Sequence, residues 1–199
     1  MNIDHNALLE VYTNQQIANV PDIDPWEAGE YAPHLVAAFL KHRFDDRRQV
    51  THRLVQSGYE TGCSNRLEEF GGRSQAVTLG YSGGADFYGH GTAMTTHDYN
   101  YEEVGKLMGL PNLAQRLEAI GCKNDDQPNG PGTHGSAWSP VWPSRLRRIR
   151  DMARVGDAAF DEIMQAWLGA SVGHPSYWDR WVLYRAMINN MPRPLFVDA

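Results

Sequence analysis

The chain has 199 residues, of which 42% are hydrophobic and 21% charged, and its formal net charge is −6. A chain of this length buries roughly 70% of the surface that its unfolded form exposes, so it can fold without a metal or a disulfide. The composition excludes a wholly disordered protein, a collagen-like fibre and a coiled coil. The length indicates one domain, or one domain with a small appendage.

The acidic charge balance argues against a general nucleic-acid binder, which normally carries a basic surplus. Five arginines within 145–154 form the one basic cluster, which we interpret as the solvated face of a helix. No apolar run approaches the ~20 residues that span a bilayer, so we expect no stable membrane insertion. The first residues lack the basic and apolar regions of a signal peptide, which predicts synthesis in a cytoplasm.

The sequence lacks the patterns of common metal and redox sites. Two cysteines, Cys63 and Cys122, are too few for a disulfide framework, and no Cys-x-x-Cys pair suggests zinc. The eight histidines show no clustered ligand spacing. We therefore predict no metal, no cofactor and a passive thiol at Cys63.

The first sixty residues have the pattern of three helices. Apolar residues at steps of three and four predict helices over about 6–18, 30–43 and 47–59. Asp45 or Asp46 is suited to be the N-cap of the third helix.

Glycine crowds the next stretch, 62–98, which we expect to form a long loop with a small β-hairpin at about 75–81 and 86–95. A loop this long inside a compact domain is more often functional than idle. The residues at its borders are therefore candidates for a functional site.

Asn100 suits the N-cap of the next helix, because Glu103 can complete a capping box, and this helix should end at Met108. The remaining predicted elements are a short helix, a loop and three helices, over about 112–120, 123–143, 144–154, 157–168 and 176–190. Ser144, Asp157 and Ser176 are suited to be the N-caps of the last three helices. The sum is a mainly α protein with one long glycine-rich insertion.

Three glutamates border the glycine-rich stretch: Glu60 at a helix end, and Glu68 and Glu69 shortly after it. A helix end can place a carboxylate at the lip of a cleft, and a loop that starts there can return a second carboxylate opposite it. Two such groups can cleave a glycosidic bond, because one protonates the leaving oxygen while the other activates water or acts as nucleophile. Paired glutamates are also common on solvated surfaces, so spacing alone leaves both interpretations open.

The segment from Phe87 to Tyr101 carries residue types that bind sugars. Glycines flank His90, so the backbone can approach a ligand or another strand closely. Aromatic side chains can stack on sugar rings, and Thr96 and Asn100 offer hydrogen bonds to hydroxyl or acetamido groups. A glycine-rich β-hairpin whose aromatic side chains only pack against the protein explains the same pattern equally well.

Together, these segments resemble glycoside hydrolase family 19, the chitinases and phage endolysins of the lysozyme-like superfamily. The family's Ala-rich helix matches 31–39, and its Gln-x-x-His-Glu-Thr/Ser-Gly helix end matches 56–62. Its glycine-rich segment with a closing Asn-Tyr matches 88–101, and its late Asp-Arg helix matches 178–184. The resemblance spans about 30–190, and the order of the motifs makes it specific.

The resemblance implies a lysozyme-like, mainly α (α+β) domain over 30–199, after a helical extension over 1–29. The glycine-rich loop and a small β-hairpin would flank its substrate cleft. It implies an inverting hydrolase with Glu60 as general acid and Glu69, or in second place Glu68, as the base that activates water. The two carboxylates of an inverting enzyme are roughly 6.5–9.5 Å apart.

The resemblance also implies roles for the residues around the carboxylates. Thr96 matches the hydroxyl residue that holds the water, and Asn100 and Tyr101 match substrate-binding positions. Further substrate contacts are expected at Tyr59, Glu68, Tyr88, His90 and Met94.

Four positions depart from the family pattern. Tyr59 replaces the His before the acid, and His90 replaces the Arg between the glycines. Met94 replaces a Gln and cannot hydrogen-bond a sugar amide, while 168–170 lacks the family's substrate-contacting Asn. These departures motivate a second hypothesis, a non-catalytic glycan-binding or structural phage protein.

We expect a polysaccharide substrate, peptidoglycan before chitin, because the chain lacks the signal peptide and the disulfides of secreted chitinases. This combination is typical of an endolysin, which is made in the cytoplasm of an infected bacterium and acts on the cell envelope. A phage assembly is a further expected partner. A third alternative is a lytic mechanism in which Glu60 alone serves as acid and base.

Overall fold

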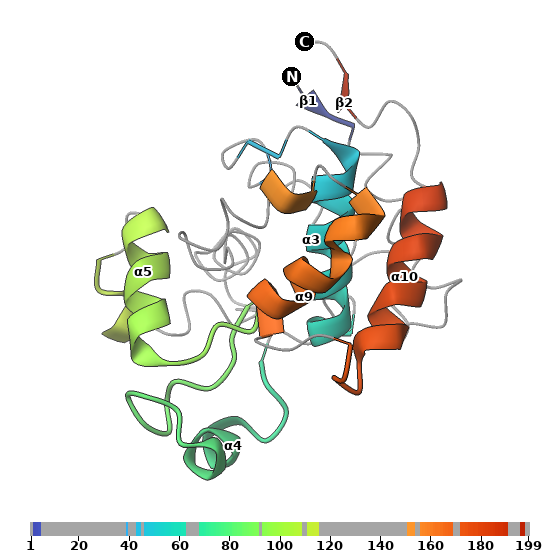
Figure 1. Cartoon of the computed structure of the whole chain (residues 1–199). Coiled ribbons are helices and arrows are strands. Elements are labelled where there is room, and N and C mark those ends of the chain that lie inside the picture. Colours follow the sequence, from blue (N-terminus) through green and yellow to red (C-terminus); the bar gives the residue numbers. More distant parts are fainter. Residues whose placement is uncertain are drawn as a thin grey trace. The chain divides into compact units, whose positions relative to one another are not determined.

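The computed structural model divides into two compact units (Figure 1). Unit 1 comprises Met1–Asn65 and Ser144–Ala199, and unit 2 comprises Arg66–Pro143. The described residues are 2–4, 39, 43–44, 46–62, 68–91, 93–108, 111–115, 151–153, 156–168, 172–190 and 196–197. Helices dominate these ranges, which confirms the prediction of a mainly α fold. Within them, no helix is long and apolar enough to cross a membrane.

α3 (Arg47–Thr61) belongs to unit 1, and local sequence signals set both of its ends. The Asp46 carboxylate accepts the N–H of Arg48 at 2.7 Å, and the Gln49 side chain accepts the N–H of Asp46 at 3.3 Å. This capping box satisfies N–H groups that have no partner inside the helix. Gly62 ends the helix in the left-handed conformation, with a φ of 55°. The predicted N-cap at Asp46 is confirmed.

α9 (Phe160–Leu168) and α10 (Tyr177–Asn190) pack against α3 in unit 1 (Figure 1). Their interface is aromatic: the Tyr184 ring lies 5.4 Å from the Phe160 ring and stacks on the His52 ring of α3 at 4.3 Å. Such aromatic pairs add roughly 0.5–1.5 kcal/mol beyond the area that they bury. The aromatic core therefore fixes α10 against α3.

The other elements of unit 1 are short. The 3-10 turn η2 (Gly156–Ala159) precedes α9, so the helix predicted at 157–168 is confirmed with a tighter first turn. α10 begins directly after Ser176, as predicted. β1 (Asn2–Ile3) pairs antiparallel with β2 (Phe196–Val197).

Unit 2 contains α4 (Gly72–Leu79), α5 (Asp98–Met108) and the 3-10 helix η1 (Leu113–Gln115). α5 and η1 pack together, and the buried members of their core are Tyr101, Val104 and Leu113. Of the helix predicted at 112–120, η1 is the described part.

The β-hairpin predicted at 75–81 and 86–95 is wrong, because α4 occupies most of the first segment. Gly71 and Gly80 bracket this helix at φ values of 86° and 67°, and the Gly80 N–H donates to two carbonyls of the last turn. Glycine in the left-handed conformation ends helices as readily as it forms hairpin turns. Gly71 and Gly80 therefore mark the two ends of a helix and not the turn of a hairpin.

The prediction of an N-cap at Asn100 is wrong, because α5 already begins at Asp98. The His97 carbonyl accepts the N–H groups of Asn100 and Tyr101 at 3.1 and 3.3 Å. The Asn100 side chain donates to the Thr96 carbonyl at 2.7 Å. Asn100 therefore stabilises the turn before the helix, a local bond that competes with capping.

Several predictions lie wholly or largely outside the described residues. They are the extension over 1–29, the helices at 6–18, 30–43 and 144–154, the loop at 123–143, the two cysteines and the arginines of 145–154.

Candidate active site

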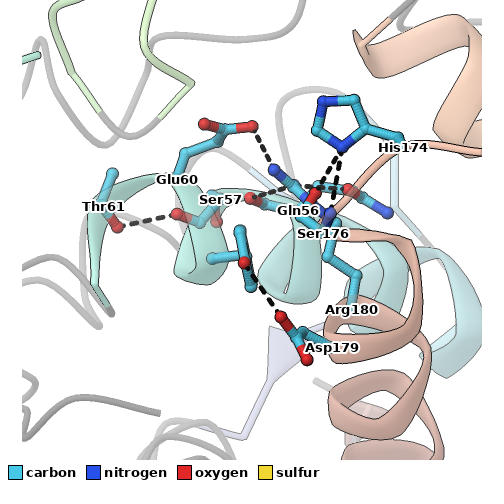
Figure 2. Close-up of polar contacts among 9 residues, drawn as sticks. Gln56, Ser57, Glu60, Thr61, His174, Ser176, Asp179 and Arg180 are labelled. Atoms are coloured by element: carbon cyan, nitrogen blue, oxygen red, sulfur yellow. Dashed lines mark hydrogen bonds and ion pairs between the residues drawn. The ribbon is translucent and has the colours of Figure 1, made fainter. Parts of the chain in front are cut away.

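Glu60 lies in the last turn of α3, where Arg180 of α10 holds it (Figure 2). Arg180 Nη2 donates to Glu60 Oε1 at 2.5 Å. The Arg180 side chain is only 2% exposed, whereas the Glu60 side chain is 24% exposed. Among the described residues this is the one hydrogen bond to the carboxylate, and Oε2 accepts none from them.

Arg180 is tolerated in the interior because every nitrogen of its guanidinium has an acceptor. Nη1 donates to the side-chain and backbone oxygens of Gln56 at 2.8 and 3.3 Å, and Nε donates to Ser176 Oγ at 3.0 Å. The centre of the guanidinium also lies 4.3 Å from the centre of the Tyr59 ring, a cation–π contact. These contacts leave the guanidinium one orientation, with Nη2 toward Glu60.

Tyr59, an expected substrate contact, lies beside Arg180 and donates its hydroxyl to Asp179 Oδ2 at 3.2 Å. Burial raises the pKa of Tyr59, and the charge of Asp179 raises it further. The phenol is therefore a neutral donor, with its ring on the guanidinium.

Gln56, Ser176 and Arg180 were not among the residues selected from sequence. Gln56 precedes Glu60 by four residues, which places both on one face of α3. Arg180 belongs to the segment that resembles the family's Asp-Arg helix, and a buried arginine needs a carboxylate partner. Helical spacing points to Gln56 and the Asp-Arg segment points to Arg180, but the burial that pairs Arg180 with Glu60 is visible only in the structure. No sequence signal marks Ser176 beyond its capping position.

Glu69 lies in unit 2, and two described residues of the same unit hold its carboxylate. Oε1 accepts the Tyr81 hydroxyl at 2.8 Å, and Oε2 accepts the Gly89 N–H at 2.8 Å. The Glu69 N–H donates to the Gly89 carbonyl at 2.7 Å. A Cβ at position 89 would lie 3.1 Å from Glu69 Cβ and 3.3 Å from Met94 Cβ. Glycine at 89 thus permits the close approach that holds this carboxylate.

Glu68, the alternative base, is exposed, and its Oε2 lies 3.5 Å from the Tyr88 hydroxyl. Its backbone forms an isolated bridge with His90, which forms another with Thr95. Glu69 is the more buried of the two neighbouring carboxylates and accepts a hydrogen bond at each oxygen, which favours it as a fixed catalytic group.

His90 and Tyr101 lie inside unit 2, both buried. His90 Nδ1 lies 2.8 Å from the Tyr88 carbonyl, which only accepts, so this nitrogen carries a proton. The Tyr101 hydroxyl contacts His90 Nδ1 and donates to the same carbonyl at 2.9 Å. Burial raises the pKa of Tyr101 well above its usual range. These residues form a buried hydrogen-bond network with the backbone of Tyr88.

Three other predicted site residues, Met94, Thr96 and Asn100, also lie in unit 2. Met94 is half-buried in the left-handed conformation, with a φ of 47°. Thr96 is also half-buried, and Asn100 is buried with its side chain on the Thr96 carbonyl. The described part of the chain provides no hydrogen bond to the Thr96 hydroxyl, which leaves that hydroxyl able to bind water.

An aromatic series leads from the surface to Glu69. The exposed Tyr99 ring stacks on His97 at 5.1 Å, and His97 lies 4.8 Å from the ring of Tyr81. His97 Nδ1 accepts the N–H of Ser82 at 3.0 Å, which fixes the imidazole. Tyr81, whose hydroxyl holds Glu69, was missed from sequence because its contact depends on the fold of the whole segment.

The described ranges contain no group of three or more His, Cys, Asp or Glu side chains that could hold a metal ion.

Comparison with known proteins relates one segment of the chain to chitinases. Two endochitinases of Arabidopsis thaliana are 36% and 34% identical to it over 70 residues. Each match covers 34% of this chain and 25% of the relative, so the chain spans about a quarter of the length of these relatives. No family model matches the chain, and no solved structure matches it.

Proposed function

We propose that the chain is a glycoside hydrolase that cleaves β-1,4 bonds of an N-acetylated glycan, with Glu60 as the general acid. The Glu60–Arg180 pair carries this proposal: one carboxylate oxygen is held by a buried guanidinium, while the other is free of protein partners among the described residues. The similarity to endochitinases supports a glycan substrate.

The chemistry assigned to Glu60 is proton donation. Protonated Oε2 gives its proton to the leaving glycosidic oxygen as the bond from that oxygen to the anomeric carbon breaks. The carboxylate that remains is negative, and Arg180 already lies against it. The guanidinium therefore stabilises charge that develops during the reaction, without a rearrangement.

We assign the base to Glu69. Its carboxylate takes a proton from a water molecule, and the hydroxide bonds to the anomeric carbon from the opposite face, which inverts the centre. Tyr81 and Gly89 fix both oxygens, and each oxygen keeps a further lone pair for the water. Thr96 is proposed to hold that water. The mechanism requires carboxylates roughly 6.5–9.5 Å apart, which a crystal structure of Glu60→Gln with a bound oligosaccharide would measure.

Peptidoglycan is the proposed substrate, ahead of chitin. Met94 stands where the family that the chain resembles has a glutamine, so a hydrogen bond from a side-chain amide to the sugar is lost and the substrate contacts differ from those of that family. As an endolysin, the protein would be made in the host cytoplasm and act on the cell envelope, free or within a phage assembly.

Digestion of purified peptidoglycan and of chitin tests this proposal. The products should be new reducing ends from peptidoglycan, formed with inverted anomeric configuration as seen by NMR. Anhydro-sugar ends in mass spectra would instead support the single-acid lytic mechanism and remove the base role from Glu69.

The departures at Tyr59, His90, Met94 and Leu168 favour one second candidate, a non-catalytic glycan-binding or structural phage protein. Binding of muropeptides or chito-oligomers without any new ends would support that candidate and reject hydrolysis.

A further inference from the structure

His174 and Ser176 precede α10 and form the outer end of the hydrogen-bond chain that reaches Glu60 (Figure 2). Ser176 Oγ lies 3.0 Å from Arg180 Nε and 2.8 Å from His174 Nδ1. The Ser176 N–H donates to the same Nδ1 at 3.2 Å. The serine hydroxyl therefore lies between the imidazole and the guanidinium.

The chemistry of these groups determines the direction of each bond. A guanidinium N–H only donates, so Ser176 Oγ accepts from Arg180. A backbone N–H also only donates, so His174 Nδ1 accepts and carries no proton. The Ser176 hydroxyl must then donate its own hydrogen to His174 Nδ1, which turns an oxygen lone pair toward Arg180.

We propose that His174 is a positioning residue for the candidate acid. Its neutral imidazole orients the Ser176 hydroxyl, the hydroxyl holds Arg180 Nε, and the guanidinium thereby presents Nη2 to Glu60. This inference rests on the proposed function, in which Glu60 donates the proton.

Burial makes the orientation of this hydroxyl consequential. Ser176 is 6% exposed and Arg180 is 2% exposed, so water does not readily replace a lost bond there. Without an acceptor at position 174, the hydroxyl is free to rotate, and its hydrogen can turn toward the Arg180 N–H. A buried donor would then lack its acceptor, and the guanidinium would shift until it found another.

Two variants of His174 separate orientation from simple packing. Asn supplies an acceptor oxygen close to the position of Nδ1, whereas Ala supplies none. In an enzyme that cleaves peptidoglycan, we expect His174→Ala to lower kcat by roughly 10- to 100-fold with little change in KM, as for a misplaced catalytic group. His174→Asn should recover most of this loss, and Val172→Ala, at an exposed site nearby, should match the wild type.

NMR spectroscopy provides a test that needs no substrate. The Arg180 Nε–H resonance should be protected from exchange in the wild type, lost in His174→Ala and restored in His174→Asn. The imidazole ¹⁵N spectrum of the wild type should place the proton of His174 on Nε2, a measurement that needs no variant to fold.

The possible outcomes distinguish this inference from the proposed function. If the wild type cleaves no glycan, the proposed function fails while the NMR test of His174 still stands. A proton on Nδ1, wild-type behaviour of His174→Ala, or no rescue by His174→Asn would each overturn the positioning role.

Discussion

Arg180 connects the two helices that form the Glu60 site. It bonds Gln56 and Glu60 of α3 from α10, across 124 and 120 residues of sequence. A buried charge of this kind is retained only where its partners are complete. Its removal should therefore affect stability as well as catalysis.

We predict that Arg180→Met lowers the free energy of unfolding by about 2 kcal/mol, less than for a fully buried pair because Glu60 is partly solvated. Glycan hydrolysis should also fall, since Glu60 loses its positioning partner. Urea denaturation checks the first effect. The control is Arg185→Met, because Arg185 is exposed on the same helix and pairs with Asp157 at the surface, where such pairs contribute about 0–1 kcal/mol. Equal losses in both variants would contradict the prediction.

At the scale of elements, α3 depends on its capping box for a defined start. We predict that Asp46→Ala lowers the free energy of unfolding by about 1 kcal/mol, because the Arg48 N–H loses its acceptor. Glu60 lies at the far end of the helix, so kcat should stay near the wild-type value. Asp46→Asn keeps a capping oxygen and should lose much less in thermal or urea unfolding; a loss equal to that of Asp46→Ala would refute the capping role.

Elements with a local signal could be predicted from sequence, and those that depend on distant contacts could not. α3 follows from apolar spacing and from Asp46 at its start, and α10 follows from Ser176 at its start. α4 was missed because Gly71 and Gly80 fit a hairpin turn and a helix end equally well.

The same division holds for the candidate site. The motif order selected Glu60 and Glu69 as the carboxylates of interest. Their partners Arg180 and Tyr81 were missed, because each contact is made by packing and not by a short spacing.

At the scale of the whole molecule, buried tyrosines link stability to alkaline pH. The pKa of Tyr177 is raised to about 12, first by burial and then by its hydrogen bond to Asp161. Burial also raises the pKa of Tyr101 and of Tyr184. The unfolded chain therefore loses these phenolic protons first, at about pH 10.

We predict that stability falls above about pH 10, by about 1.4 kcal/mol per pH unit for each such tyrosine. The fall continues until the pH reaches the folded pKa, about 12 for Tyr177. Urea unfolding between about pH 9 and pH 11 measures this decrease in the free energy of unfolding. The decrease should be smaller in Tyr177→Phe. A free energy of unfolding that stays constant over this interval would contradict the assignment.

The central claim for the whole molecule is that Glu60 donates the proton that cleaves a cell-wall glycan. Clearing of permeabilised bacterial cells, followed by turbidity, tests it most directly with the wild type, Glu60→Gln and the exposed control Glu162→Gln at matched folded concentration. We predict that the wild type and Glu162→Gln clear the cells at equal rates, while Glu60→Gln is slower by about 10²–10⁴-fold, the usual contribution of a general acid. Equal clearing by the wild type and Glu60→Gln, or no clearing by the wild type, would contradict the claim.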